Sequence, residues 1–184
     1  MLCVGGASKP EMYDAENNEM IRWLANQSPE RRHFAAIHLN WGYAMPCVEW
    51  LVTREDCDLS TCIALFWAGN PEEFLQYPNS ESVRQAGEDL DTFEFLGGIV
   101  KREAQGFYKR RQISINPEDF GRPDLYDKEA AKFRVENLPW NLAPVFRETF
   151  KGVEVNDAVG RARFITDEFR TLLKKLGTNI PTRY

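Results

Sequence analysis

The two histidines and a pair of cysteines are the residues of this chain whose types would suit a metal ion. Zinc takes imidazole and thiolate ligands, so His33, His38, Cys57 and Cys62 form a candidate set. The spacing argues against it, because five residues of helix rotate a side chain by about 140° and turn the two imidazoles apart. The two cysteines are also five residues apart, where zinc motifs have shorter spacings. We therefore expect no cofactor and no metal, with His38 in the core or at a cap and the cysteines buried as small apolar groups.

Cys57 is a second candidate, as a catalytic nucleophile. It stands just before a predicted helix start, where a thiolate is stabilised, and His33 or His38 would serve as its base. Asp56 and Asp58 flank it, however, and their negative charge disfavours a thiolate. Asp58 is better explained as the cap of the following helix. A small enzyme that uses this His/Cys/Asp cluster remains one alternative function.

Four carboxylates close together in the sequence are the third candidate. Glu88, Asp89, Asp91 and Glu94 fall on a predicted long helix, where a solvated face is their ordinary explanation. The alternative is an acidic surface that binds a basic protein partner. Three cationic residues, Lys109, Arg110 and Arg111, follow the C-terminal end of that helix, where positive charge complements the helix dipole. The sequence contains no glycine-rich phosphate loop, no nucleophile elbow and no paired zinc-ligand motif.

Composition bounds the remaining choices. The chain has 184 residues, of which 43% are hydrophobic and 28% charged, so one ordered globular domain over 1–184 is expected. A net charge of −5 opposes binding to nucleic acid, since phosphate neutralisation dominates such affinity. No apolar run is long enough to span a membrane. Four cysteines are too few for a disulfide framework and no secretory signal opens the sequence, so we expect a cytoplasmic protein.

Helix start and stop signals predict an all-α fold, a compact array of short helical hairpins plus two longer helices. The stretch from Arg31 to Trp67 is the densest in large apolar residues. The predicted short helices run from Glu11 to Asn26, from Ser28 to a left-handed cap at Gly42, from Pro46 to Asp56, from a cap at Asp58 to Gly69, and from Asn70 to Tyr77.

The two longer helices are predicted from apolar stripes. One covers Ser80–Tyr108, with stripe residues at alternating steps of three and four: Val83, Ala86, Leu90, Phe93, Gly97, Val100, Ala104 and Phe107. It indicates a helix laid across the core, with a close helix crossing at Gly97, or else the seam of a structural homodimer. The other covers Asn156–Leu176. Trp140, in a loop between them, is predicted to be a buried anchor, and residues 80–184 could form a subdomain.

Several short motifs carry a family resemblance. They are Pro29-Glu30-Arg31, His38-Leu39-Asn40-Trp41-Gly42, Val48-Glu49-Trp50-Leu51, and Cys57-Asp58-Leu59-Ser60-Thr61 followed by Ala64-Leu65-Phe66-Trp67. With them, residues 28–77 resemble a bacterial domain-of-unknown-function family, number 4274. The usual family pattern is similar to Asn-Trp-Asp-x-Gly, whereas here Gly42 follows Trp41 directly. The resemblance implies a small helical domain in a bacterial protein and no known chemistry.

Together these features favour a non-catalytic protein that binds another protein. The most concrete form is a bacterial immunity or antidote protein that covers a cognate toxin, since small acidic binders suit basic toxic enzymes. Its partner-binding residues would be Glu88, Asp89, Asp91 and Glu94, supported by exposed aromatic side chains. Neither nucleic acid nor a membrane is expected as a partner.

Overall fold

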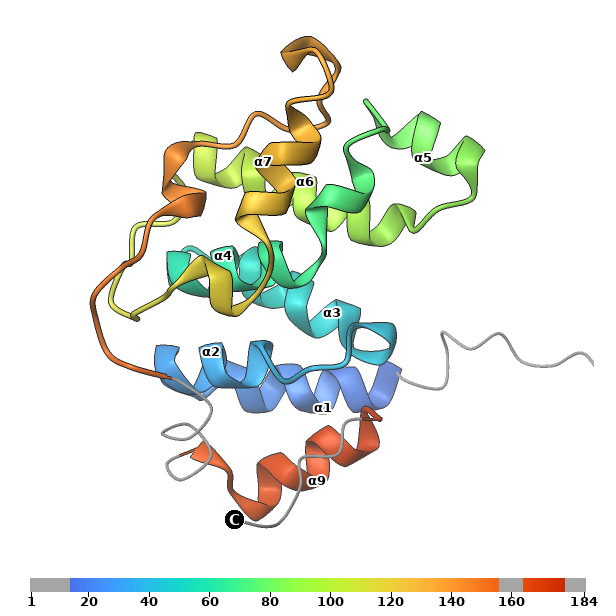
Figure 1. Ribbon diagram of the computed structural model, residues 1–184. Coiled ribbons are helices and arrows are strands. Elements are labelled where there is room, and N and C mark those ends of the chain that lie inside the picture. Colours follow the sequence, from blue (N-terminus) through green and yellow to red (C-terminus); the bar gives the residue numbers. More distant parts are fainter. Residues whose placement is uncertain (1–13, 156–163, 178–184) are drawn as a thin grey trace, which may run out of the picture.

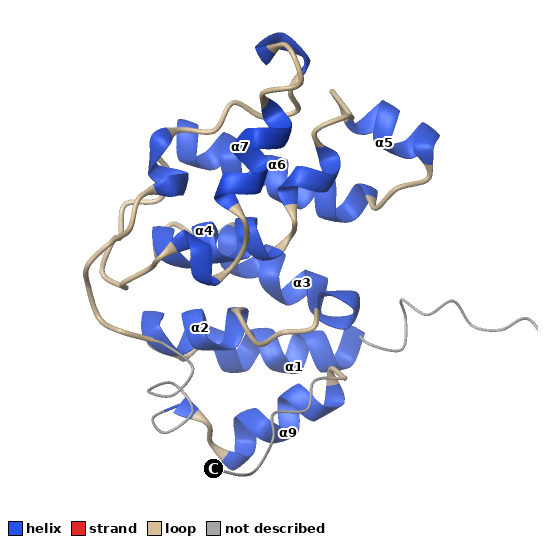
Figure 2. Cartoon of the chain, in the orientation of Figure 1, coloured by secondary structure: helices blue, strands red, loops and turns tan. Residues whose placement is uncertain are grey.

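The computed structural model describes residues 14–155 and 164–177, and within them the fold is all-α, as predicted (Figures 1 and 2). Extended residues in this part of the chain pair only through isolated bridges. The helices are α1 (Asp14–Ala25), α2 (Pro29–Ala36), α3 (Trp41–Val52), α4 (Leu59–Ala68), α5 (Ser80–Ala86), α6 (Leu90–Ala104), α7 (Pro123–Ala130) and α9 (Asp167–Lys175), with 3-10 turns η2 (Pro71–Phe74), η3 (Pro117–Asp119), η4 (Val135–Asn137) and η5 (Pro144–Arg147).

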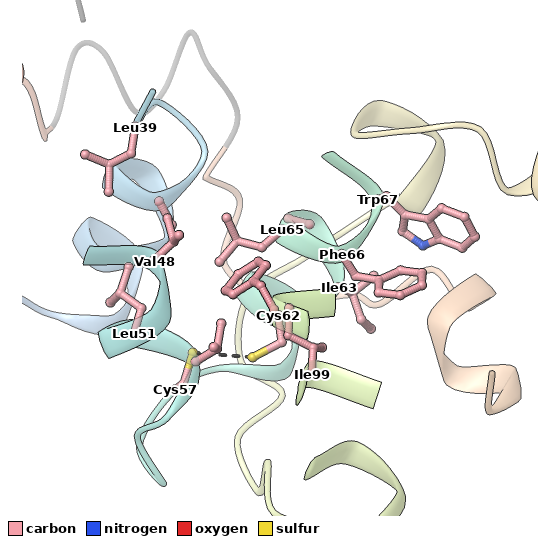
Figure 3. Close-up of a cluster of buried hydrophobic side chains, with 14 of the residues drawn as sticks. Leu39, Val48, Leu51, Cys57, Cys62, Ile63, Leu65, Phe66, Trp67 and Ile99 are labelled. Atoms are coloured by element: carbon pink, nitrogen blue, oxygen red, sulfur yellow. Dashed lines mark hydrogen bonds between the residues drawn. The ribbon is translucent and has the colours of Figure 1, made fainter. Parts of the chain in front are cut away.

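Helix α4 lies at the centre of this arrangement (Figure 1). Nine consecutive residues, Leu59 to Trp67, are all buried. Seven of them are apolar, and the polar Ser60 and Thr61 make hydrogen bonds inside the protein. Helices α2, α3 and α6 and the turn η3 all contact α4. Figure 3 shows its side chains Ile63, Leu65 and Phe66 among those of neighbouring elements. The buried hydrophobic residues, from Met20 to Leu176, form one contiguous cluster.

Local capping signals place the first helices where the sequence predicts them. Ser28 accepts a hydrogen bond from the Arg31 backbone, with Pro29 at the first position of α2. Asp58 caps α4 by accepting from Ser60 N at 3.0 Å, and α4 ends at Gly69. These boundaries confirm the prediction, because each depends on residues within one turn.

The predicted cap at Gly42 is wrong. Asn40 instead caps the N-terminus of α3 by accepting a hydrogen bond from Gly42 N, so Gly42 lies in the first turn of a helix. Pro46, predicted to open that helix, stands two residues after a kink at Ala44, in the first turn of the second part of α3. A proline in a helix removes one hydrogen bond and crowds the preceding turn. Accordingly the backbone of Ala44 leaves the helical region, and α3 is kinked there.

The predicted long helix over Ser80–Tyr108 is two helices, α5 and α6. Gly87 adopts φ 74° and ends α5, and Asp89 then caps α6 through Thr92 N. The apolar stripe continues across this break because α5 and α6 each direct an apolar face toward the core. Val83, Phe93 and Val100 are buried within the chain's own core.

Gly97 accommodates a side chain from a loop where a helix crossing was predicted. A Cβ atom at Gly97 would lie 3.0 Å from the Trp140 indole nitrogen. Trp140 is 7% exposed and packs against the rings of Phe66, Phe74 and Phe93. The prediction of Trp140 as a buried anchor is confirmed.

The predicted last helix is interrupted before α9. Residues 156–163 lie outside the described residues, and the chain is not helical at Ile165 and Thr166. Thr166 caps α9 by accepting a hydrogen bond from Phe169 N at 3.1 Å. Helix α9 packs on α1, where Phe169 stacks on Trp23 with ring centroids 4.7 Å apart. None of the described helices has the length and apolarity needed to cross a membrane.

Arg32 on α2 connects three segments of the chain: α2 itself, the end of α1, and the loop between α3 and α4. Its guanidinium donates to the carbonyl oxygens of Leu24 and Ala25 at the end of α1 and to Asp56 Oδ2 at 2.7 Å. Arg54 donates to the other oxygen of Asp56. Hydrogen bonds from Arg54 and Arg32 hold the pKa of Asp56 well below its usual range. A charged Asp56 therefore stabilises the fold, and protonated Asp56 does not.

Replacing Asp56 with Asn should lower the free energy of unfolding by about 1–2 kcal/mol at neutral pH, because the mostly buried Arg32 loses its charged partner. Since the folded pKa is depressed, the difference from wild type is full above the unfolded pKa of about 4 and shrinks as pH falls below it. Urea titrations across pH measure this. The control Glu81→Gln removes only the exposed pair with Arg84 and should cost at most about 0.5 kcal/mol.

Candidate functional site

The four predicted partner-binding carboxylates are all exposed, but they do not share one helix. Asp91 and Glu94 lie on the outer face of α6. Asp89 is its cap, with Oδ1 accepting from Thr92 N and Oδ2 from the Thr92 hydroxyl. Glu88 lies in the connection between α5 and α6 and accepts a hydrogen bond from the Tyr77 hydroxyl. Asp89 thus also has a structural role as a helix cap. Asp91 and Glu94 do not cap the helix, so their carboxylates are better placed to contact a partner.

The acidic region is larger than these four residues. The segment 70–95 contains seven acidic residues and one basic residue, a net charge of −6, while the whole chain carries −5. The three that sequence reasoning missed are Glu72, Glu73 and Glu81. They lie on η2 and α5, and both elements contact α6. Counting charge by segment would have found them, because the rest of the chain is close to neutral.

A shallow groove adjoins this acidic segment. It has a volume of about 220 Å³ and lies between α3 and α6, lined among others by Glu49, Glu94, Phe95 and Arg102. Partial burial and the nearby charge of Asp91 raise the pKa of Glu49. Carboxylates from two helices therefore converge here, and Arg102 offsets their repulsion only in part. An incoming cation would relieve it further.

His33 lines a second cavity, of about 250 Å³, on another part of the surface. The ring is 1% exposed, and Nδ1 lies 3.0 Å from Thr61 Oγ1 on α4. Burial, with a smaller contribution from His38, lowers the pKa of His33 to about 4. The imidazole is therefore neutral at physiological pH. The sequence analysis named His33 as a candidate residue but did not predict a cavity beside it.

The rest of this cavity comes from segments far along the chain. Ser114 donates its backbone N–H to Val153 O, and Ile115 and Phe150 exchange two backbone hydrogen bonds. These pairings bring two extended segments together beside α2. The polar side chains that they and η3 add to the lining are Ser114, Asn116, Asp119, Thr149 and Glu154.

The two cysteines of the predicted cluster contact each other. Cys57 Sγ and Cys62 Sγ lie 3.5 Å apart, both buried in the core (Figure 3). Burial raises the pKa of the Cys62 thiol well above its ordinary value, which opposes nucleophilic reactivity. The Nδ1–H group of His38 donates a hydrogen bond to Phe34 O at 2.7 Å. Among the described residues, no three His, Cys, Asp or Glu side chains form a group that could hold a metal ion.

Comparison with known proteins locates the core within a family. Residues 27–103 match the family described as Domain of unknown function (DUF4274). This part of the chain is a DUF4274 domain. The predicted resemblance is confirmed, and it extends past Tyr77 to include α5 and nearly all of α6. No curated protein and no solved structure matches the chain.

The DUF4274 domain contains the whole acidic segment and the groove beside it. The His33 cavity is different, since its other lining residues, from Ser114 to Val155, lie beyond residue 103. The two sites therefore have separate structural supports, and substitutions can test them separately.

Gly152 is required for the pairing that forms the cavity. A Cβ atom there would lie 2.2 Å from Gln112 O, a backbone atom that cannot move aside without parting the two segments. Gly152→Ala should destabilise the fold by about 1–3 kcal/mol, a typical cost of overpacking. Hydrogen exchange should show faster exchange at the amides of Ser114, Ile115 and Val153.

Gly42→Ala is the matched control for that substitution. A Cβ atom at Gly42 meets only Asn40 Oδ1, at an ordinary contact distance of 3.4 Å. Its melting temperature should stay at or above that of wild type, since alanine favours a helix over glycine. Equal melting temperatures for the two variants would contradict the role given to Gly152.

Proposed function

We propose that this protein acts by binding a basic protein partner through the acidic segment 70–95, without catalysis. The observation that carries the proposal is the concentration of the net charge, −6 within that segment against −5 for the chain. Such a concentration directs a positively charged partner to one side of the molecule and speeds its association.

The construction of α6 supports this use of its outer face. Its inner residues Phe93, Leu96 and Ile99 are buried against the core, so the helix is held in place by packing. Asp91 and Glu94 point outward from a rigid element and need little ordering on binding. The groove beside Glu94 adds apolar area from Val52 and Phe95, which a basic side chain's methylene groups would cover.

The most concrete form of the proposal is an immunity or antidote protein in a bacterial cytoplasm. It would bind a cognate basic toxin and block access to the toxin's active site. Two features support this version: the acidic charge, and the resemblance of the DUF4274 domain to a family of bacterial domains. No specific observation favours the two alternatives, a small enzyme and a homodimer joined through the stripe from Val83 to Phe107.

Neutralising the outer face of α6 tests the proposal. The variant carrying both Asp91→Asn and Glu94→Gln should bind a basic partner, sought first among the proteins encoded beside its gene, about tenfold or more weakly at low salt, because charges at an interface set the association rate. Its salt dependence should fall as well. Surface plasmon resonance at several salt concentrations measures both, and thermal melting checks that the fold is kept.

The control carries Glu136→Gln and Glu148→Gln, two exposed acids outside the segment. It has the same net charge as the first variant, so it separates a local surface from overall charge. Equal weakening by both variants, or no complex with any basic protein, would refute the proposal.

A further inference from the structure

We propose that the cavity at His33 binds a small organic cation, a primary ammonium or guanidinium group. Two carboxylates from different segments, Asp119 at the end of η3 and Glu154 in the later extended segment, line it together with Phe120 and Phe150. Of the lining residues that the structure describes, none is a lysine or an arginine. The proposal does not depend on the acidic segment or on the protein-binding function.

The charges of the lining residues select a cation over an anion. Asp119 and Glu154 accept hydrogen bonds, and Asn116 Nδ2 donates to Asp119 Oδ1 at a long 3.4 Å. Each carboxylate therefore keeps oxygen lone pairs for a ligand with several N–H groups. An anion would be repelled by both and would find only neutral donors.

The aromatic residues point to the same ligand class. The face of an aromatic ring carries partial negative charge and attracts a cation. The chain's own Arg111 already lies 5.6 Å from the centroid of the Phe150 ring. Phe120, which meets the His33 ring edge to face at 6.1 Å, adds a second aromatic wall.

His33 contributes a neutral polar wall. Thr61 occupies Nδ1, and within residues 14–155 and 164–177 no hydrogen bond joins Nε2 to another residue. Because burial keeps the ring uncharged, it can contact a cation without repelling it. When Nδ1 carries the ring proton, Nε2 can accept a hydrogen bond from an N–H group of the ligand.

The volume limits the size of the ligand. Drug-sized ligands occupy pockets of about 300–1,000 Å³. At about 250 Å³ this cavity suits a group of the size of an amino-acid side chain. A free amine such as agmatine and an arginine side chain of another protein share this chemistry, and the experiment distinguishes them.

Isothermal titration of the full chain with agmatine is the first measurement, followed by a Gly-Arg-Gly peptide with blocked ends. Saturable one-to-one binding of agmatine indicates a free amine, and binding of the peptide alone indicates an arginine side chain. The matched peptide Gly-citrulline-Gly, which replaces the cation by a neutral ureido group, should bind about tenfold or more weakly than the arginine peptide. Equal binding of both peptides, or no saturable binding of any probe at millimolar concentration, would overturn the proposal.

Variants locate the binding in this cavity. Asp119→Asn with Glu154→Gln should weaken binding about tenfold or more, whereas Glu118→Gln with Glu148→Gln, exposed neighbours that do not line the cavity, should leave it within about twofold. The Asp91→Asn/Glu94→Gln variant should bind the probes like wild type. Equal losses in the first two pairs would place the binding elsewhere and refute the assignment.

Discussion

The carboxylate of Asp58 holds together two parts of the chain that are more than fifty residues apart. It is 2% exposed, and its two oxygens have different partners. Oδ1 accepts from Ser60 N and caps α4, whereas Oδ2 accepts from Gln112 N at 2.7 Å. Leu59 N donates to Arg110 O beside it, and the Ser60 hydroxyl donates to Ile113 O. A helix that is buried on all sides cannot leave its first N–H groups to water, so the later segment must supply their partners.

The other end of α4 depends on the later chain in the same way. The Trp67 indole N–H donates to Phe146 O at 2.7 Å, and a Cβ atom at Gly121 would lie 2.6 Å from Trp67 O. Both contacts come from residues beyond the DUF4274 domain. The central helix of the family domain is thus enclosed at each end by segments that the family match does not include. The hydrogen bonds of Asp58, Leu59 and Ser60 place residues 110–113 against the start of α4. The pairing of residues 112–115 with residues 150–153 then forms the cavity beside His33.

The range of each interaction explains what could be predicted from the sequence. Ser28, Asp58 and Gly69 act on their own turn, so their caps could be read locally. The stripe through Val83 and Phe93 correctly identified buried residues, but periodicity continues across a break when both helices face one core. Gly87 followed by Asp89 was the overlooked signal, a helix stop and then a helix start. The His33 cavity depends on a pairing between extended segments that no local pattern encodes, and Gly152 shows its importance only when its neighbour Gln112 is known.

Under the proposed function, helix α6 serves both stability and binding. Its inward residues fill the core next to α4 and leave a space at Gly97 for Trp140, so few substitutions on that side would fit. Its outward residues Asp91 and Glu94 make no contact that the core requires. Only a binding partner would therefore require acidic side chains at these two positions. Asp89 belongs to both groups, since one carboxylate caps the helix and adds to the acidic segment. A protein that binds through such a face keeps its fold while the binding face changes, because packing and recognition depend on different sides of the same helix.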